Sequence, residues 1–271
     1  MSAPQNIQSR LATPETETEF TCPDTHRHLH PEDKQDKSTI PDYLSDAYWW
    51  AYLAGPAVWF FDHQLIINAI LLGQYRRIMR TFIGFLDPAQ AGTTLQLAAV
   101  YGELTPSLAR HLKRGTFHLI DVAPVQLRKA CRKLVRQGTP VSLERMNAEA
   151  LGYASNSFDT VLIYFLLHEL PKDARERALH EALRVLRPGG KLLIAEYGEL
   201  ERPNVLHRLA LVRTVFEHAE PYLHSFWSRP LDAHITAAAG GTGKTAVKGK
   251  HVDILGGFYG VTEYRLEQAG S

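Results

Sequence analysis

This chain of 271 residues has little cysteine, no excess of one charge sign and no long apolar run. Its two cysteines, Cys22 and Cys131, are far apart and predict neither a disulfide framework nor a zinc site. The 30 basic and 29 acidic residues nearly cancel, so the sequence offers no basic footprint for nucleic acid. No apolar run reaches the roughly 20 residues that a membrane-spanning helix requires. We therefore expect a protein that has no nucleic-acid partner and is soluble or lies on a membrane.

The amino-terminal sequence also bears on where the protein resides. Its first residues, MSAPQNIQSR, lack the basic and then apolar pattern of a secretory signal. The scarcity of cysteine favours a reducing compartment. The expectation is the cytoplasmic side of a membrane, in a bacterial cytoplasm or a compartment like the mitochondrial matrix.

Composition divides the chain into three parts. Residues 1–42 carry eight acidic and four basic side chains and few apolar ones. Because such a segment buries too little apolar surface to offset its ordering entropy, it is expected to be a flexible polar tail. Residues 43–90 are predicted to form an aromatic-rich helical segment, and residues 91–271 the main domain.

The aromatic-rich segment holds three of the four tryptophans, all within residues 43–61. Tryptophan and tyrosine combine an apolar body with a polar edge, which suits a bilayer headgroup region or the mouth of a lipid-binding groove. The same residues could equally form a helix that packs on the main domain. Residues 65–86 keep apolar positions at helical spacing and predict one helix that leads into this domain.

From residue 93 the sequence alternates between strand and helix patterns, which is typical of a parallel sheet with helices on both faces. An antiparallel pair without a helix closes the chain at 247–266. The predicted class is therefore a three-layer α/β fold. Strands are expected at 93–100, 116–123, 141–149, 158–170 and 191–197, and helices at 104–115, 125–138, 172–186 and through 203–239.

Ligands of open α/β sheets bind beyond the carboxyl ends of the strands, so the residues at these ends are the candidate site. Asp121 follows the second strand, where an acid can accept two hydrogen bonds from a ribose diol. Asn147 follows the third strand, where an amide can pair with an adenine edge. Tyr164 and His168 follow the fourth strand. Each sign is weak alone, but their order predicts a nucleotide-type pocket.

Four stretches carry a resemblance to a known family: LQLAAVYGELTPSLA, HLIDVAP, NAEALGYASNSFDTVLIYFLLHEL and LRPGGKLLIAEY. They resemble the successive motifs of class I S-adenosylmethionine-dependent methyltransferases, and the nearest branch looks like the ubiquinone/menaquinone C-methyltransferases over residues 58–266. The resemblance implies a Rossmann-like fold, with a seven-stranded, mostly parallel sheet and a carboxyl-terminal antiparallel hairpin. It also implies S-adenosylmethionine as cofactor, bound by Gln96, Ala98, Val100, Tyr101, Gly102, Asp121, Val122, Asn147, Ala148 and Tyr164.

The first motif departs from this family. Gln96 stands where the family usually has an acid, and the turn Ala99-Val100-Tyr101-Gly102 keeps only the last glycine. Together with YWWAYLAGPAVWFFDH, this departure closely resembles the rhodoquinone biosynthesis enzymes, the RquA family. That resemblance implies that S-adenosylmethionine donates an amino group, which replaces a ring methoxy group of ubiquinone with the help of manganese(II) in anaerobic respiration.

The replacement of the acid has a physical rationale. An amino nitrogen attacks an electrophilic carbon only in its neutral form, and a nearby carboxylate would favour the ammonium form. Gln96 removes that bias and still offers hydrogen bonds. The expected catalytic residues are Gln96, Tyr101, Tyr164 and His168.

Two alternatives to this reaction stay open. One is C- or O-methylation of a polyprenyl quinone, and the other is a non-catalytic adenosyl-binding partner in quinone synthesis. The metal ligands also stay open among His168-Glu169, Asp62-His63 and Glu196, which carry the imidazole and carboxylate groups that manganese accepts. A lipid substrate implies peripheral membrane contact. The oligomeric state is left open.

Overall fold

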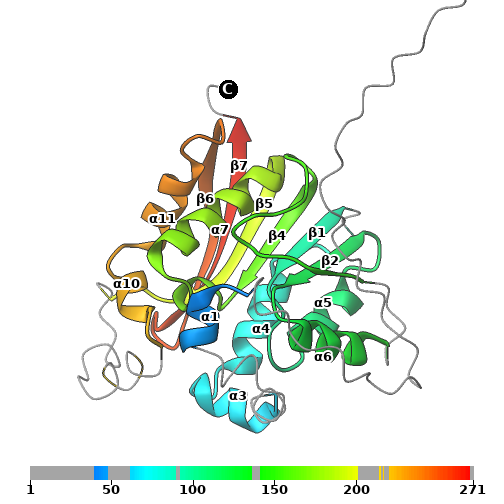
Figure 1. The fold of residues 1–271 in the computed structure, drawn as a ribbon, viewed down its shortest axis with the longest axis vertical. Helices are drawn as coiled ribbons and strands as arrows, with labels where there is room; N and C mark the ends of the chain where they lie inside the picture. The colour runs from blue at the N-terminus through cyan, green and yellow to red at the C-terminus, as the bar shows by residue number, and fades with distance from the viewer. Residues whose placement is uncertain are drawn as a thin grey trace, which may run out of the picture.

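One mixed sheet organises the part of the chain that this computed structural model describes, residues 40–47, 62–89, 92–135, 141–200 and 220–268 with Thr214 and Phe216. Within it, the strands lie in the order β3-β2-β1-β4-β5-β7-β6 (Figure 1). Their bounds are β1 Thr93–Leu97, β2 Thr116–Asp121, β3 Ser142–Arg145, β4 Phe158–Tyr164, β5 Leu186–Tyr197, β6 Lys244–Ile254 and β7 Tyr259–Gln268.

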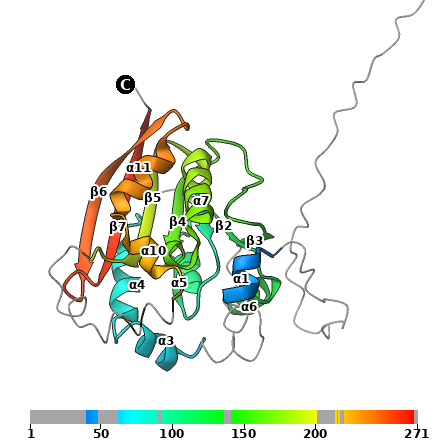
Figure 2. The ribbon, with the colours of Figure 1, turned by 60° about the vertical axis from the view of Figure 1, so that its left-hand side comes forward.

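Helices cover both faces of the sheet (Figures 1 and 2). On one face lie α4 (Tyr75–Gly84), α5 (Leu104–His111) and α6 (Pro124–Val135). On the other lie α7 (Lys172–Val185) and α11 (Leu231–Ala239), which pack on each other. The shorter helices are α1 (Asp42–Ala47), α3 (Gln64–Ile70), η3 (Leu167–Glu169) and α10 (Leu223–Trp227).

The pairing of the strands confirms the predicted sheet. β1 pairs in parallel with both β2 and β4, and further parallel pairs join β2 to β3 and β4 to β5. β7 runs antiparallel between β5 and β6, so the expected carboxyl-terminal hairpin is present. The central strands are apolar because helices bury both of their faces, and Leu95, Leu162 and Ile194 are fully buried. The winding direction changes between β1 and β4, and this reversal opens the sheet edge where a ligand can sit.

The structure corrects two of the predicted elements. The single helix expected at 65–86 is two helices, α3 and α4, because the chain turns at Leu72 and Gly73, which both have positive φ angles. The strand expected at 158–170 ends at Tyr164. Phe165 then adopts a φ of 52°, and η3 follows. This turn brings the backbone N–H of Leu167 to the buried carboxylate of Glu196, at 3.0 Å.

Several expectations fall on residues outside the described ones. These are the polar tail over 1–39, the aromatic stretch 48–61 and most of the helical prediction before α10. A search of the described helices finds none that is long and apolar enough to span a bilayer. Cys131 on α6 is disulfide-bonded, which differs from the expectation that the two cysteines form no disulfide.

Candidate functional site

A pocket lies at the carboxyl ends of β1, β2 and β3, beside η3. The pocket together with the open space at its mouth encloses about 630 Å³. Five of the residues predicted to bind a cofactor line it: Ala98, Asp121, Val122, Asn147 and Ala148. The other predicted site residues are not part of its lining: Gln96, Val100, Tyr101, Gly102, Tyr164 and His168.

Asp121 is the acidic group that ends β2 inside this pocket. Its Oδ2 accepts the backbone N–H of Ala99 at 2.8 Å, and its Oδ1 accepts the N–H of Ala123 at 2.7 Å. Burial raises the pKa of this carboxyl from 3.8 to about 6, although the two backbone hydrogen bonds work against the shift. Each oxygen keeps a second lone pair. The group can therefore accept hydroxyl donors of a ligand while the two backbone bonds hold it in place.

The loop after β3 forms the opposite wall through Asn147 and Ala148. Asn147 Oδ1 accepts the backbone N–H of Glu149 at 2.9 Å, and its Nδ2 lies 3.5 Å from the carboxylate of the same residue. The side-chain amide thus stabilises its own turn. The groups of this wall that can bind a ligand base are the backbone at Ala148 and the remaining lone pair of Asn147 Oδ1.

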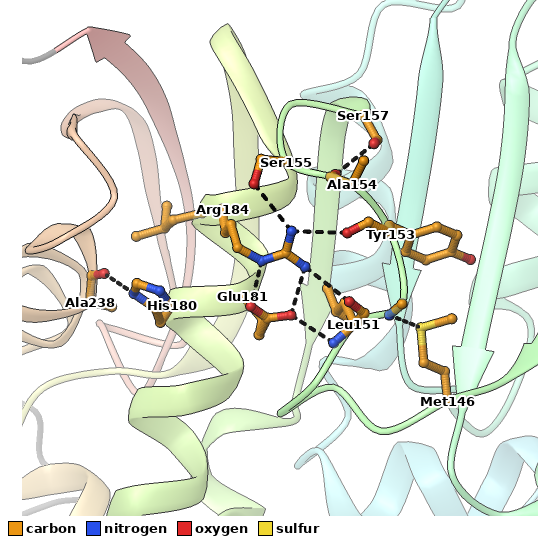
Figure 3. Close-up of polar contacts among 12 residues, drawn as sticks. Met146, Leu151, Tyr153, Ala154, Ser155, Ser157, His180, Glu181, Arg184 and Ala238 are labelled. Atoms are coloured by element: carbon orange, nitrogen blue, oxygen red, sulfur yellow. Dashed lines mark hydrogen bonds and ion pairs between the residues drawn. The ribbon is translucent and has the colours of Figure 1, made fainter. Parts of the chain in front are cut away.

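An ion pair on α7 anchors the continuation of this loop (Figure 3). Arg184 and Glu181 pair at 2.6 Å. The guanidinium donates to the carbonyls of Leu151 and Tyr153, each at 2.9 Å, and the carboxylate accepts the N–H of Leu151 at 2.7 Å. Two side chains of α7 therefore hold the backbone of this loop, which fixes the position of the wall before a ligand arrives.

The first turn, after β1, depends on Gln96. This side chain is fully buried, and its Nε2 donates to the carbonyl of Ala98 at 2.9 Å and to the hydroxyl of Thr105 at 3.0 Å. Since a carbonyl only accepts, a carboxylate at this position could not make the bond to Ala98. Ala98 has a φ of 66°, in the left-handed region that favours glycine. Gln96 thus stabilises a strained turn from beneath.

Tyr101 leaves this turn toward α6. Its hydroxyl accepts a hydrogen bond from Nε2 of Gln126 at 3.3 Å, and the ammonium of Lys129 lies 4.2 Å from the centre of its ring. Burial raises the pKa of the Tyr101 phenol above its usual value, so the phenol keeps its proton. The ring forms part of the structure behind the pocket wall, with its hydroxyl next to the pocket-lining Gln126.

Gly102 closes the turn at a φ of 80°, and a Cβ there would lie 2.3 Å from the hydroxyl oxygen of Tyr75. This explains why the last glycine of the motif is kept. Its backbone N–H donates to Oδ1 of Asp62 at 2.8 Å. The same oxygen accepts the ammonium groups of Lys133 at 2.6 Å and Lys129 at 3.0 Å. Asp62 therefore joins the start of α3 to the first turn.

His168 lies inside the protein, away from the pocket lining. Its Nδ1 is 2.6 Å from Oε1 of Glu196, and its Nε2 is 3.9 Å from Oε2 of Glu220. Burial alone would lower the pKa of His168, but the charges of these acids and of Glu169 outweigh it and raise the pKa from 6.5 to about 9. The imidazole of η3 is therefore a buried cation, held between Glu196 of β5 and Glu220.

Arg175 belongs to the same buried cluster. Its guanidinium donates to the carbonyls of Leu167 and Leu170, each at 2.8 Å, and to the hydroxyl of Ser225 at 3.0 Å. The cluster ties η3 to α7 and α10. Of the three residues on η3, Glu169 reaches the pocket lining, so the cluster positions this acid.

The proposed metal ligands do not fit a manganese ion. Asp62 is occupied by two lysines, and Glu196 is occupied by His168 and three backbone N–H groups. Among the residues that the structure describes, no three His, Cys, Asp or Glu side chains lie close enough together to hold a metal ion. None of these side chains is therefore assigned to a metal.

Aromatic side chains pack beside the pocket at the ends of β4 and β5. Tyr164 packs on Phe82 at 5.1 Å between ring centres, and Phe165 contacts both Tyr197 and Tyr259 at 5.6 Å. The hydroxyls of Tyr164 and Tyr259 are buried and find no hydrogen-bond partner in the described structure. An unpaired buried hydroxyl is costly. Both hydroxyls are enclosed by protein, and neither residue is part of the pocket lining.

Sequence reasoning missed several residues that line the pocket. Tyr43 on α1 covers the opening, and its hydroxyl donates to Oε1 of Glu149 at 2.9 Å. Gln126 lines the pocket from the first turn of α6, five positions after Asp121. The signal for Gln126 was its place on the helix that follows the acid. Tyr43 carried no such signal, because its contact spans 106 positions of the chain.

Known proteins match this region of the chain. A family model for a methyltransferase domain matches residues 95–190. The chain is 30% identical over 145 residues to the ubiquinone/menaquinone biosynthesis C-methyltransferase UbiE of Hydrogenovibrio crunogenus, covering 52% of this chain and 56% of that protein. It is 36% identical over 138 residues to UbiE of Klebsiella pneumoniae, covering 49% and 54%. The chain thus spans about half the length of these curated relatives.

Solved structures of methyltransferases share the architecture. The 1,6-didemethyltoxoflavin-N1-methyltransferase of Burkholderia thailandensis, solved with S-adenosylhomocysteine, is 19% identical with a TM-score of 0.52, covering 84% of this chain and 88% of that one. A Pyrococcus horikoshii protein is 15% identical with a TM-score of 0.52, covering 83% and 99%. The chain therefore has the Rossmann-like class I methyltransferase fold, and the residues that match the methyltransferase-domain model supply most of the pocket lining.

Proposed function

We propose that this chain binds S-adenosylmethionine in the pocket and transfers its amino nitrogen to a polyprenyl quinone, in place of a ring methoxy group. The relatives named ubiquinone/menaquinone C-methyltransferases support an adenosyl ligand and a quinone substrate. The pocket fits the adenosyl half, because Asp121 has lone pairs available for two ribose hydroxyls and Ala148 lines the wall expected for adenine.

The observation that carries the amino-transfer proposal is the buried neutral Gln96. Its amide donates to the carbonyl of Ala98 and to Thr105, and it brings no negative charge to the first turn. A carboxylate within a few ångströms would raise the pKa of an amine and so keep a donor nitrogen protonated. A neutral Gln96 adds no second carboxylate to the one that Asp121 already brings to this turn, and so leaves more of that nitrogen with the free lone pair that attack on a ring carbon requires.

In the proposed reaction the nitrogen adds to the ring carbon that carries the methoxy group. The new carbon–nitrogen bond forms as the carbon–methoxy bond breaks, and methanol leaves with a proton from the nitrogen. The bond between the nitrogen and the methionyl α-carbon then breaks by elimination: the nitrogen keeps the electron pair and gains a proton, the β-carbon loses a proton, and a carbon–carbon double bond forms in the methionyl remnant. The chain's own residues bind and orient the donor: Asp121 holds the ribose, and the apolar side chains of Leu44, Leu166 and Leu170 line the same pocket.

Methyl transfer to a quinone is the second candidate, and the identity to UbiE proteins favours it. One incubation separates the candidates: the purified protein with S-adenosylmethionine and ubiquinone, with and without manganese(II), analysed by mass spectrometry. Loss of a methoxy group with gain of an amino group supports amino transfer. Gain of a methyl group alone would establish the methyltransferase, and ligand binding without product would indicate a non-catalytic partner.

Two variants test the role of charge at Gln96. We expect Gln96→Glu to lower amination by about ten- to 1,000-fold, because a carboxylate raises an adjacent amine's pKa by about 1–3 units. Gln96→Met is the matched control, since it also loses the bond to Ala98 but adds no charge. Equal turnover of the two variants, at equal affinity for S-adenosylhomocysteine, would contradict a charge effect.

A further inference from the structure

We propose that α3 and the first turns of α4 form a docking surface for an anionic lipid bilayer, at the end of the molecule where the pocket opens. This proposal does not depend on the proposed reaction, because it uses only the exposure and the charge of residues on α3 and α4. We call residues 65–80 the docking surface.

The apolar part of this surface lies on α3 and the turn that follows. Of six large apolar side chains that the described residues expose, three lie within residues 65–72: Leu65 is 83% exposed, Ile70 42% and Leu72 38%. Leu65 and Ala69 are four positions apart on α3 and share one face, and Leu72 follows in the turn after the helix. The other face of the same helix, with Ile67 and Leu71, is buried in the core. The helix thus has two apolar faces, of which only one packs on the protein.

The polar part of the surface is basic. Arg76, Arg77 and Arg80 are all exposed, and no acidic residue occurs between His63 and Leu86. An apolar stripe next to a cluster of arginines is the combination by which peripheral proteins bind anionic lipid, with apolar side chains below the headgroups and cations at them. The charge favours a bilayer over a second copy of this chain, because two such clusters would repel each other.

The position of the surface suits this occupant. Figures 1 and 2 both place α3 at the end of the molecule near α1, on the side to which the carboxyl ends of β1 and β4 point. Asp62, directly before α3, bonds the backbone of Gly102 in the first turn. A bilayer that contacts α3 would therefore lie on the same side as the pocket mouth, within reach of a substrate with an isoprenoid tail.

Two charge-matched variants test the proposal with the full chain. The first is the double variant Arg76→Gln with Arg77→Gln, and the second is Lys113→Gln with Arg114→Gln. The second pair is also exposed and also removes two charges, but it lies between α5 and β2, at the amino ends of the strands. Binding is measured by sedimentation with vesicles of phosphatidylcholine and phosphatidylglycerol, and with vesicles of phosphatidylcholine alone.

We expect the α4 pair to weaken partitioning to the anionic vesicles by about 30-fold, since each basic residue at such a surface contributes about fivefold. The control pair should bind as the wild type does. Leu65→Ser should weaken binding by about tenfold through lost apolar burial, whereas Val247→Ser on β6 should not.

Three outcomes would overturn the proposal: equal losses in both charge pairs, no vesicle binding by the wild type, or a change of oligomeric state in the α4 pair with unchanged vesicle binding. Melting temperature and far-ultraviolet circular dichroism verify that each variant is folded. Because no quinone or adenosyl ligand enters this assay, failure of the docking surface and failure of the proposed reaction are distinguishable.

Discussion

Two buried acids, Asp121 at the end of β2 and Glu196 near the end of β5, lie in the same sheet with β1 and β4 between them and have opposite roles. Asp121 receives backbone N–H groups only, and burial raises its pKa to about 6. Glu196 receives backbone N–H groups and also the cation of His168 at 2.6 Å. The first faces the pocket and the second does not. A buried carboxylate without a cationic partner can therefore still accept hydrogen bonds from a ligand, whereas one that is paired with a cation stabilises the fold.

The largest expected effect follows from Glu196→Gln. Removing one partner of a buried ion pair leaves His168 uncompensated, so we expect a loss of about 3–5 kcal/mol in the free energy of unfolding. Chemical denaturation measures this loss. Glu176→Gln is the control, because its pair with Arg229 is exposed and should contribute less than about 1 kcal/mol. A small effect at Glu196 would show that this acid is not a structural partner.

The same pair predicts a pH dependence of stability. The pKa of His168 rises from 6.5 to about 9 in the folded protein, because the surrounding acids outweigh burial. Its contribution is complete below pH 6.5 and is lost as the pH rises through 9, by about 3 kcal/mol in total. Unfolding measured from pH 6.5 to 9 should show this decline in the wild type. The decline should be reduced in Glu196→Gln, and an unchanged slope would contradict the assignment.

Asp121→Asn tests the other half of the comparison. We expect affinity for S-adenosylhomocysteine to fall by about ten- to 100-fold, because hydrogen bonds to a charged acceptor contribute about 1.5–3 kcal/mol. Stability should change little, since the variant no longer buries a charge. Titration calorimetry also gives a sharper test: wild-type affinity should decrease below pH 6 as the carboxyl is protonated. An Asp121→Asn protein with the same pH profile would rule out this role.

The smallest effect is expected at the turn that presents an N–H group to Asp121. Ala98→Gly relieves the positive φ of 66° and should stabilise the fold by about 1 kcal/mol or less. Leu255→Gly, at a φ of 54° in the β6–β7 turn, is the matched control. Both should raise the melting temperature, but only Ala98→Gly should change ligand affinity, because Ala99 donates to Asp121. Equal affinities would separate the turn from the site.

The succession of strands and helices along the chain and the place of Asp121 were predictable, because both follow from local patterns: apolar runs alternating with helices, and an acid at the end of a strand. The position of His168 looked equally informative. Its partner Glu196 lies 28 positions away on the next strand, and no periodicity shows that the two side chains meet. The contacts of Tyr43 with Glu149 and of Asp62 with Gly102 span 106 and 40 positions. Such contacts depend on how elements dock, which a single sequence does not display.

The helix that carries Tyr43 has a kinetic consequence. Its hydroxyl shares Glu149 with Arg177, whose guanidinium lies 2.6 Å from the same carboxylate. A ligand in the pocket would lie against Tyr43, so this hydrogen bond holds one wall of the site in place. Loosening of α1 would therefore speed both the release of a spent nucleoside product and the entry of a fresh donor.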